Sequence, residues 1–288
     1  MSRVRLLGAL ASRPRRWRYG PEPSQRADLY LPRGALGRGP LPVAVMLHGG
    51  SWQVRYGKVV MLGLVADLVR GGWAVWNVEY RRVGGAEHGG WPGTFVDVAA
   101  AIDRLAELGS GRDGGRPLDL GRVSFVGHSA GGQLALWAAS RDRLPPGAPG
   151  AGPRVRPVAV ASLAGVNDLA GAYRARPDGI VGAFIGGGPD EWPERYDVAD
   201  PIRLVPPCAP VLLVHGVEDA TVSVARSRAY AAAARAAGVE VTLVEVAGVR
   251  GRHRAHLDPA SEGWGWARAW LAEQVAREAL AQAGGGVR

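Results

Sequence analysis

The amino-acid sequence predicts an α/β fold with a mostly parallel central sheet flanked by helices. Apolar, strand-like runs alternate with amphipathic helical stretches along most of the 288 residues, which is the pattern of strands joined by helical crossovers. The length suits one sizeable domain, and no internal repeat divides the chain. We therefore expect a single domain over residues 27–288, preceded by a basic N-terminal extension over residues 1–26.

The first half of the chain is expected to hold three strands and two helices. The helix over residues 59–69 is predicted from apolar residues at helical spacing, and Gly71 and Gly72 follow it as a stop signal. The other expected elements are an early edge strand over 27–31, a buried strand over 43–47, a strand over 73–80 and a helix over 94–108.

The second half continues the alternation around two interruptions. Residues 144–157 are rich in proline and glycine and predict a surface loop, because proline disrupts both helix and strand. Residues 168–205 look irregular and rich in aromatic side chains, so we expect a short lid insertion there. The expected strands are 122–126, 158–163, 211–214 and 239–246, and the expected helices are 130–140, 223–237 and 260–283.

The charge of the chain does not indicate a nucleic-acid partner. The formal net charge is +9, but Lys58 is the single lysine and the arginines are scattered, apart from clusters within 13–18 and 250–254. No nucleic-acid reader motif accompanies them, and no uniform 18-residue apolar segment indicates a membrane span. We expect neither nucleic acid nor membrane as a partner, and the sequence leaves the oligomeric state open.

The single cysteine, Cys208, excludes an internal disulfide and fits a reducing compartment. Near the N-terminus, Arg3 and Arg5 precede an apolar run that is too short for a secretory signal, and Arg13 follows it. We therefore expect a cytoplasmic location.

The most informative segment is Gly127-His128-Ser129-Ala130-Gly131-Gly132, which lies between an expected strand and an expected helix. A serine on such a strand-to-helix turn can project its hydroxyl as a nucleophile. Glycines two positions away on either side suit a turn that is too tight for side chains. The segment therefore predicts a nucleophilic serine at Ser129, although a helix-capping serine is the alternative.

A nucleophilic serine needs a base, and the base needs a carboxylate to orient it. The strand over 211–214 leads into a loop with Glu218 and Asp219, and the strand over 239–246 leads into a loop with His253 and His256. In a parallel sheet both loops open at the same edge as the Ser129 turn. The sequence by itself leaves two candidate acids and two candidate bases.

Backbone N–H groups are also needed to hold the oxyanion that forms when the serine attacks an acyl carbon. The segment from His48 to Trp52 follows an earlier expected strand and offers the N–H groups of Gly50 and Ser51. The N–H of Ala130, at the start of its helix, is the expected further donor. We also expect Trp52 to contact the substrate as part of the acyl pocket.

Residues from about 28 to 271 resemble the α/β-hydrolase superfamily, particularly small esterases and the kynurenine formamidase (arylformamidase) group. The segments that carry the resemblance are 28–32, 48–52, 78–81, 127–132, 215–219 and 253–259. Two positions depart from the family's usual pattern: Ser223 stands where a proline is common, and Arg254 stands where an aromatic residue follows the catalytic histidine.

The resemblance implies an α/β-hydrolase fold and a catalytic triad of Ser129, Asp219 and His253, with Asp219 preferred to Glu218 and His253 to His256. We expect the rejected histidine to be exposed to solvent. The implied activity is hydrolysis of small carboxylic esters through an acyl-enzyme, without cofactor or metal. The alternatives are arylformamidase-type hydrolysis of an N-formyl aromatic amide and, in a different class, a non-catalytic ligand-binding scaffold.

Overall fold

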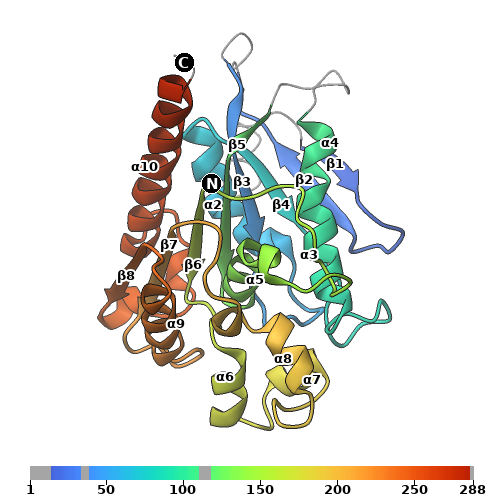
Figure 1. The fold of residues 1–288 in the computed structure, drawn as a ribbon. Coiled ribbons are helices and arrows are strands. Elements are labelled where there is room, and N and C mark those ends of the chain that lie inside the picture. The colour runs from blue at the N-terminus through green and yellow to red at the C-terminus, as the bar shows by residue number, and fades with distance from the viewer. Residues whose placement is uncertain (1–13, 34–38, 110–117, 286–288) are drawn as a thin grey trace.

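The computed structural model describes residues 14–33, 39–109 and 118–285, and it contains one eight-stranded sheet with helices on both faces (Figure 1). The spatial order of the strands is β1-β2-β4-β3-β5-β6-β7-β8, and every pair from β4 to β8 is parallel. The strands are β1 (Arg15–Arg18), β2 (Arg26–Tyr30), β3 (Leu41–Leu47), β4 (Ala74–Val78), β5 (Leu118–His128), β6 (Ala159–Leu163), β7 (Val211–Gly216) and β8 (Val241–Val246). The predicted fold, a mostly parallel sheet flanked by helices, is confirmed.

The helices mostly lie where sequence periodicity predicts them. The α-helices are α2 (Leu62–Arg70), α3 (Gly93–Asp103), α4 (Leu105–Leu108), α5 (Ala130–Ala139), α6 (Leu169–Ala175), α7 (Ile180–Ile185), α8 (Pro193–Ala199), α9 (Ala225–Ala236) and α10 (Glu262–Gly285). The 3₁₀ segments are η1 (Lys58–Met61), η2 (Arg141–Arg143), η3 (Pro201–Leu204), η4 (Gly248–Gly251) and η5 (Ala255–Leu257). Within the described residues, no helix has the length and apolar character needed to cross a bilayer.

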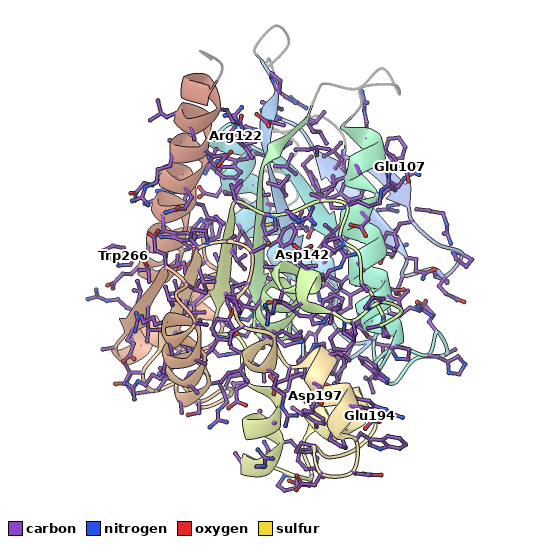
Figure 2. All side chains as sticks on the ribbon, in the orientation of Figure 1. Glu107, Arg122, Asp142, Glu194, Asp197 and Trp266 are labelled. Carbon is purple, nitrogen blue, oxygen red and sulfur yellow. The ribbon has the colours of Figure 1, made fainter. Side chains whose placement is uncertain are left out.

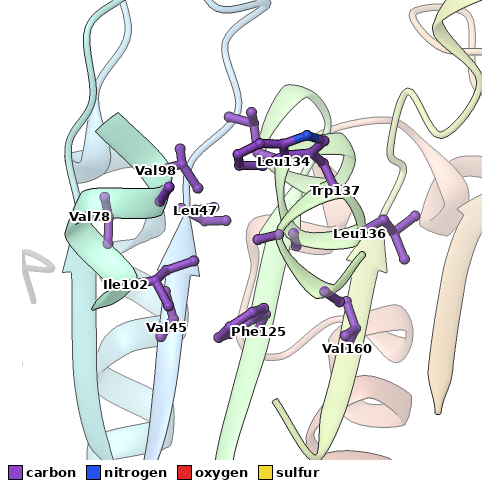
Figure 3. Close-up of a cluster of buried hydrophobic side chains, with 14 of the residues drawn as sticks. Val45, Leu47, Val78, Val98, Ile102, Phe125, Leu134, Leu136, Trp137 and Val160 are labelled. Carbon is purple, nitrogen blue, oxygen red and sulfur yellow. The ribbon is translucent and has the colours of Figure 1, made fainter. Parts of the chain in front are cut away.

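The core consists of two hydrophobic layers, one on each face of the sheet. Successive side chains of a strand point to opposite faces, so β3 sends Val45 and Leu47 to one layer and Ala44 and Met46 to the other. Helices α3, α5 and α9 cover the first layer, and Figure 3 shows part of it between α3, α5 and the strands. Helices α2 and α10 cover the second layer. Trp266 projects from α10 away from the sheet and is 54% exposed (Figure 2).

Two predictions at the start of the chain are wrong. The strand at 26–30 is not at the edge, because β1 pairs antiparallel with it and β2 pairs in turn with β4. The described part of the predicted extension, residues 14–26, therefore contains β1, the connection to β2 and the first residue of β2; residues 1–13 lie outside the described residues. The sequence of β1, Arg-Arg-Trp-Arg, has no strand-like apolar pattern and looks like a basic cluster. Such charges suit an exposed edge strand, which is why the strand was not predicted.

The insertion at 168–205 is helical rather than irregular. It forms α6, α7, α8 and η3, which lie beyond the carboxyl ends of the parallel strands at one end of the molecule (Figure 1). The buried carboxylate of Asp200 accepts hydrogen bonds from the N–H groups of Leu169 and Ala170 at 2.8 and 2.9 Å. The phenyl ring of Phe184 stacks on Trp52 at 4.2 Å. Each helix is one or two turns long, so its periodicity is too brief to detect in sequence, and tertiary contacts hold it.

Helix α5 approaches the sheet so closely that side chains are excluded at the contact. A Cβ atom on Gly131 would lie 2.0 Å from the carbonyl oxygen of Leu47, at the end of β3. A Cβ atom on Gly127 would lie 1.9 Å from the carbonyl oxygen of Gly131. Both contacts are with backbone, which cannot rotate away as a side chain can. The two glycines therefore fix how far α5 stands from β3 and β5.

Gly131→Ala is expected to lower the free energy of unfolding by about 2–4 kcal/mol, because α5 must shift to admit the methyl group. Gly265→Ala, within α10, is the matched control, since nothing lies within 4 Å of the added Cβ. We expect that control to stabilise the protein by up to about 1 kcal/mol through helix propensity. Chemical denaturation measures both changes, and equal effects at the two positions would contradict the close-contact argument.

Candidate active site

Ser129 occupies a strained turn between β5 and α5. Its backbone has φ 54° and ψ −120°, which is unusual for a residue with a side chain. The Ser129 N–H donates to the carbonyl of Leu163 on β6 at 2.8 Å, and the Ser129 carbonyl accepts from the N–H of Gly132 at 2.9 Å. These bonds hold the turn from both sides, so the hydroxyl of Ser129 is presented at the edge of the sheet.

The structure brings Ser129, His253 and Asp219 into one chain of hydrogen bonds. Nδ1 of His253 lies 2.7 Å from Oδ2 of Asp219, and Nε2 of His253 lies 2.9 Å from Oγ of Ser129. Because an ionised carboxylate only accepts, Nδ1 carries the proton and Nε2 is free to accept from the serine hydroxyl. The geometry gives a serine with a base in contact and a carboxylate behind the base.

The Asp219 carboxylate is held ionised. Burial by itself would raise its pKa, but the hydrogen bonds from His253 and from the N–H groups of Val222 and Thr221 outweigh burial and lower the pKa below the ordinary value. Nε2 of His215 lies 3.6 Å from Oδ2 of Asp219. The same Nε2 donates to the carbonyl of Val222 at 2.9 Å, and this bond orders the loop that carries Asp219.

Glu218 and His256, the alternative acid and base, contact other parts of the protein. The exposed Glu218 accepts a hydrogen bond from the N–H of Gly248 at 2.8 Å, which ties its loop to η4. His256 is fully buried, and the expectation that it is exposed was wrong. Its pKa falls to about 4 because burial disfavours the charged ring, and neither ring nitrogen has a hydrogen-bond partner within the described chain. His256 is buried because its ring packs against Gly263 at the start of α10. The absence of a side chain at Gly263 makes room for the ring, since a Cβ atom there would lie 2.4 Å from Nδ1 of His256.

The predicted oxyanion donors lie on two segments beside Ser129. Gly50 has φ 121° and Ser51 φ 54°, and the segment is fixed by backbone bonds from the Val83 N–H to Trp52 and from the Val54 N–H to Val83. Within the described residues, the N–H groups of Gly50, Ser51 and Ala130 donate no hydrogen bond. Unoccupied N–H groups at a helix start and on a turn suit a developing negative charge.

A buried polar cluster holds the segment from His48 to Trp52, called the oxyanion segment below, in place. Nδ1 of His48 lies 2.8 Å from the carbonyl of Gly49, and Nε2 lies 2.8 Å from a carboxylate oxygen of Glu79. The ring of His48 stacks on Tyr80, whose hydroxyl donates to the His48 carbonyl at 2.6 Å. For Glu79, burial by itself would raise the pKa, but the bond from His48, with the Arg82 charge and the Lys58 N–H, lowers it to about 2.

His128 is a further residue of the site to which the sequence analysis assigns no role. It is buried, and its Nε2 donates to the carbonyl oxygen of His253 at 2.8 Å. Burial lowers the pKa of His128 to about 3, so the ring remains neutral. The bond joins the serine turn to the histidine loop, 125 residues away. Its position next to Ser129 was the available signal, but no sequence pattern shows the partner carbonyl.

Two cavities meet at Ser129. The larger, of about 610 Å³, lies under the lid and is lined by Trp52 together with residues of α6 and α7. The smaller, of about 190 Å³, includes Tyr56, Val60, Leu257 and Arg254. Trp52 lines the larger cavity and also anchors the lid: besides stacking on Phe184, its indole N–H donates to Gln133 at 3.2 Å.

Within the described chain, no group of three or more His, Cys, Asp or Glu side chains is arranged to hold a metal ion. The polar side chains at the sheet edge are instead used in the bonds between Ser129, His253 and Asp219.

Comparison with known proteins decides the family. The family model described as BD-FAE matches residues 27–233. The chain belongs to the BD-FAE family. This is an α/β-hydrolase esterase family, so the resemblance to α/β-hydrolase esterases predicted from the motifs is confirmed.

Two esterases of Mycobacterium tuberculosis (strain ATCC 25618 / H37Rv) are among the relatives. Esterase LipC is 28% identical over 237 residues, covering 77% of this chain and 55% of LipC. Esterase LipQ is 29% identical over 208 residues, covering 68% of this chain and 46% of LipQ. The BD-FAE chain thus spans about half the length of these curated relatives.

Among solved structures, esterase B from Lactobacillus Rhamnosis (HN001) superposes with a TM-score of 0.78 at 19% identity, over 99% of this chain and 93% of esterase B. The likeness confirms the α/β fold of the BD-FAE chain.

Glu79→Gln is expected to remove a pH-dependent part of the stability. A folded-state pKa of about 2, below the ordinary 4.5, means that the folded state favours the ionised form. The resulting stability, about 3 kcal/mol, is present above pH 4.5 and is lost as the pH falls through about 2. The difference in unfolding free energy between wild type and variant should therefore be largest near neutral pH and shrink between pH 4.5 and 2.

The control is Glu240→Gln, because Glu240 is 58% exposed. Its unfolding free energy should stay close to that of the wild type at every pH. If the difference in unfolding free energy between wild type and Glu79→Gln stays constant from pH 7 to pH 2, the Glu79 charge does not stabilise the fold.

Proposed function

We propose that this BD-FAE protein is a serine hydrolase that cleaves small carboxylic esters through a covalent acyl-enzyme. The observation that carries the proposal is the hydrogen-bond chain from Asp219 through His253 to Ser129, at 2.7 and 2.9 Å. Such an arrangement activates a hydroxyl that is otherwise a weak nucleophile. The relatives LipC and LipQ are named as esterases, which supports the same activity.

In the first half of the reaction, Oγ of Ser129 forms a bond to the acyl carbon while its proton passes to Nε2 of His253. The carbonyl oxygen becomes an oxyanion, which the N–H groups of Ser51 and Ala130, with that of Gly50, are placed to stabilise. Asp219 stabilises the imidazolium and keeps the ring oriented. The ester bond then breaks, and the leaving alcohol takes the proton from Nε2 of His253.

In the second half, water attacks the acyl carbon of the acyl-enzyme and gives its proton to Nε2 of His253. Collapse of the second tetrahedral intermediate releases the carboxylic acid and returns the proton to Oγ of Ser129. His128 keeps the His253 loop in place through its bond to the His253 carbonyl. The low pKa of His128 makes its ring a weak base, and its Nε2 is used in the bond to the His253 carbonyl, so His128 is a positioning residue.

The two cavities differ enough in size to divide the substrate between them. We assign the acyl group to the smaller cavity of about 190 Å³, where Tyr56, Val60 and Leu257 form the walls. The leaving group then lies in the larger cavity of about 610 Å³ under the lid. This assignment moves Trp52 from the acyl pocket, where the sequence predicts it, to the leaving-group side.

The second candidate is hydrolysis of an N-formyl aromatic amide, since a formyl group fits the smaller cavity and the same residues would act on an amide. A substrate panel that compares nitrophenyl esters with an N-formyl aromatic amide separates the two activities, and a strong preference for the amide over every ester would favour the second. The cytoplasmic location stays a prediction from sequence.

Ser129→Ala is expected to lower kcat by about 10⁴- to 10⁶-fold without unfolding the protein, because only the nucleophile is removed. His253→Ala should cause a comparable loss and Asp219→Asn a loss of about 10⁴-fold. Steady-state hydrolysis of nitrophenyl acetate measures these changes, and circular dichroism checks the fold. Wild-type rates in Ser129→Ala would refute the mechanism.

Glu218→Gln is the matched control for the acid and should stay within a few-fold of the wild-type rate, because its side chain faces η4 rather than the base. His256→Asn is the control for the base. His256 is buried, so this variant is compared after its folding has been verified. A larger loss of kcat in a folded His256→Asn than in His253→Ala would transfer the role of base to His256.

Chain-length specificity is expected to follow from the smaller cavity. One added methylene gains at most about 1–3 kcal/mol, and overlap costs more once the pocket is full. The value of kcat/KM should therefore peak between acetyl and butyryl nitrophenyl esters and fall steeply by octanoyl. Val60→Ala should raise the hexanoyl-to-acetyl ratio, whereas Val59→Ala, at a position 64% exposed, should not. A kcat/KM that keeps rising to decanoyl would contradict the assignment.

A further inference from the structure

The larger cavity beside Ser129 is lined by an arginine from each of three chain segments. Arg55 follows the oxyanion segment, Arg176 follows helix α6 of the lid, and Arg226 lies on α9 beyond the Asp219 loop. The same lining includes the carboxylate of Asp178. Three guanidinium groups around one substrate cavity are more than the ester chemistry described above requires.

Two of the three guanidinium groups lack a carboxylate partner. Arg226 pairs with Asp168 at 2.8 Å, and Asp168 also accepts from the N–H of Gly171. For Arg55 and Arg176, no ion pair to a carboxylate is formed within residues 14–33, 39–109 and 118–285. The guanidinium of Arg55 lies over the ring of Tyr56, 5.1 Å from its centroid, which restrains its position.

The residues that line the cavity are positively charged on balance. Three arginines and one carboxylate, that of Asp178, form part of the lining, while Asp168 and Asp219 lie behind it, bonded to Arg226 and His253. Arg55 and Arg176 are exposed at the mouth of the cavity, so solvent and salt screen part of their charge and their attraction for an anion is strongest at low salt. Guanidinium groups bind carboxylates and phosphates through paired N–H donors.

Resting on the proposed ester hydrolysis, we propose that the larger cavity binds a leaving group that carries an anionic group, with Arg55 and Arg176 as its partners. The preferred substrates are then short-chain esters of acidic alcohols or phenols. The arginines act on binding and capture of the substrate, while Ser129, His253 and Asp219 act on the ester bond.

The test compares two acetyl esters of similar shape that differ in charge: 4-acetoxybenzoate, which carries a carboxylate on the leaving phenol, and the neutral 4-acetoxybenzamide. The quantity measured is the ratio of their kcat/KM values, anionic over neutral. Dividing it by the ratio of their hydroxide-catalysed rates removes the difference in leaving-group reactivity. We expect a corrected ratio of about ten for the wild type at low salt, falling several-fold in about 0.5 M NaCl through screening.

The variants Arg55→Gln and Arg176→Gln should each lower the corrected ratio by about three- to tenfold, and Arg176→Glu should bring it below one. Arg174→Gln is the matched control: Arg174 lies on α6, is 58% exposed and faces Asp190 at 3.5 Å, outside the cavity lining. Its corrected ratio and its rate with either ester should equal those of the wild type.

The outcomes separate this inference from the proposed function. If the wild type hydrolyses the neutral ester but its corrected ratio is near one, or if the arginine variants leave the ratio unchanged, the anionic subsite is wrong and the esterase activity stands. If the folded wild type hydrolyses no ester of either panel, the proposed function fails. A ratio that depends on salt, Arg55 and Arg176 and not on Arg174 supports the subsite.

Discussion

The contact of helix α5 with the end of β3 is the constraint on which the site depends. Only backbone and a glycine fit there, since a Cβ atom on Gly131 would lie 2.0 Å from the Leu47 carbonyl. The contact places the start of α5 directly beside the segment that follows β3. As a result the Ser129 turn, the N–H of Ala130 and the N–H groups of Gly50 and Ser51 share one small region. The unusual φ of 54° at Ser129 persists because packing on both sides holds it.

Histidines with different partners give this site its rigidity. His48 bridges the Gly49 carbonyl and the Glu79 carboxylate beneath the oxyanion segment. His128 stays neutral and links the serine turn to the carbonyl of His253. Among the described histidines, His253 is the one in contact with both Asp219 and Ser129. The neighbours of each ring therefore decide its role, and under the proposed mechanism the same residue type supplies a support, a tether and a base.

The lid connects the chemistry to substrate selection. Gln133 on α5 accepts from the Trp52 indole and donates to the carbonyl of Ala199, so the oxyanion segment, the serine helix and the lid are joined. The same lid brings Arg176 to the cavity that Trp52 lines. Substitutions of lid residues that line this cavity can thus alter its walls without disturbing the hydrogen bonds at the sheet edge.

The sequence by itself determined the alternation of strands and helices, the serine turn, and the loops that carry Asp219 and His253, because these depend on local periodicity and glycine placement. It did not reveal β1 or the short lid helices, which owe their stability to distant contacts rather than to local propensity. Only the tertiary structure decided that His256 is buried under α10 and that Glu218 turns to η4. Only the tertiary structure places Arg176 of the lid in the lining of the larger cavity beside Ser129. Partners more than 100 residues apart are selected by packing, and packing is a property of the whole fold.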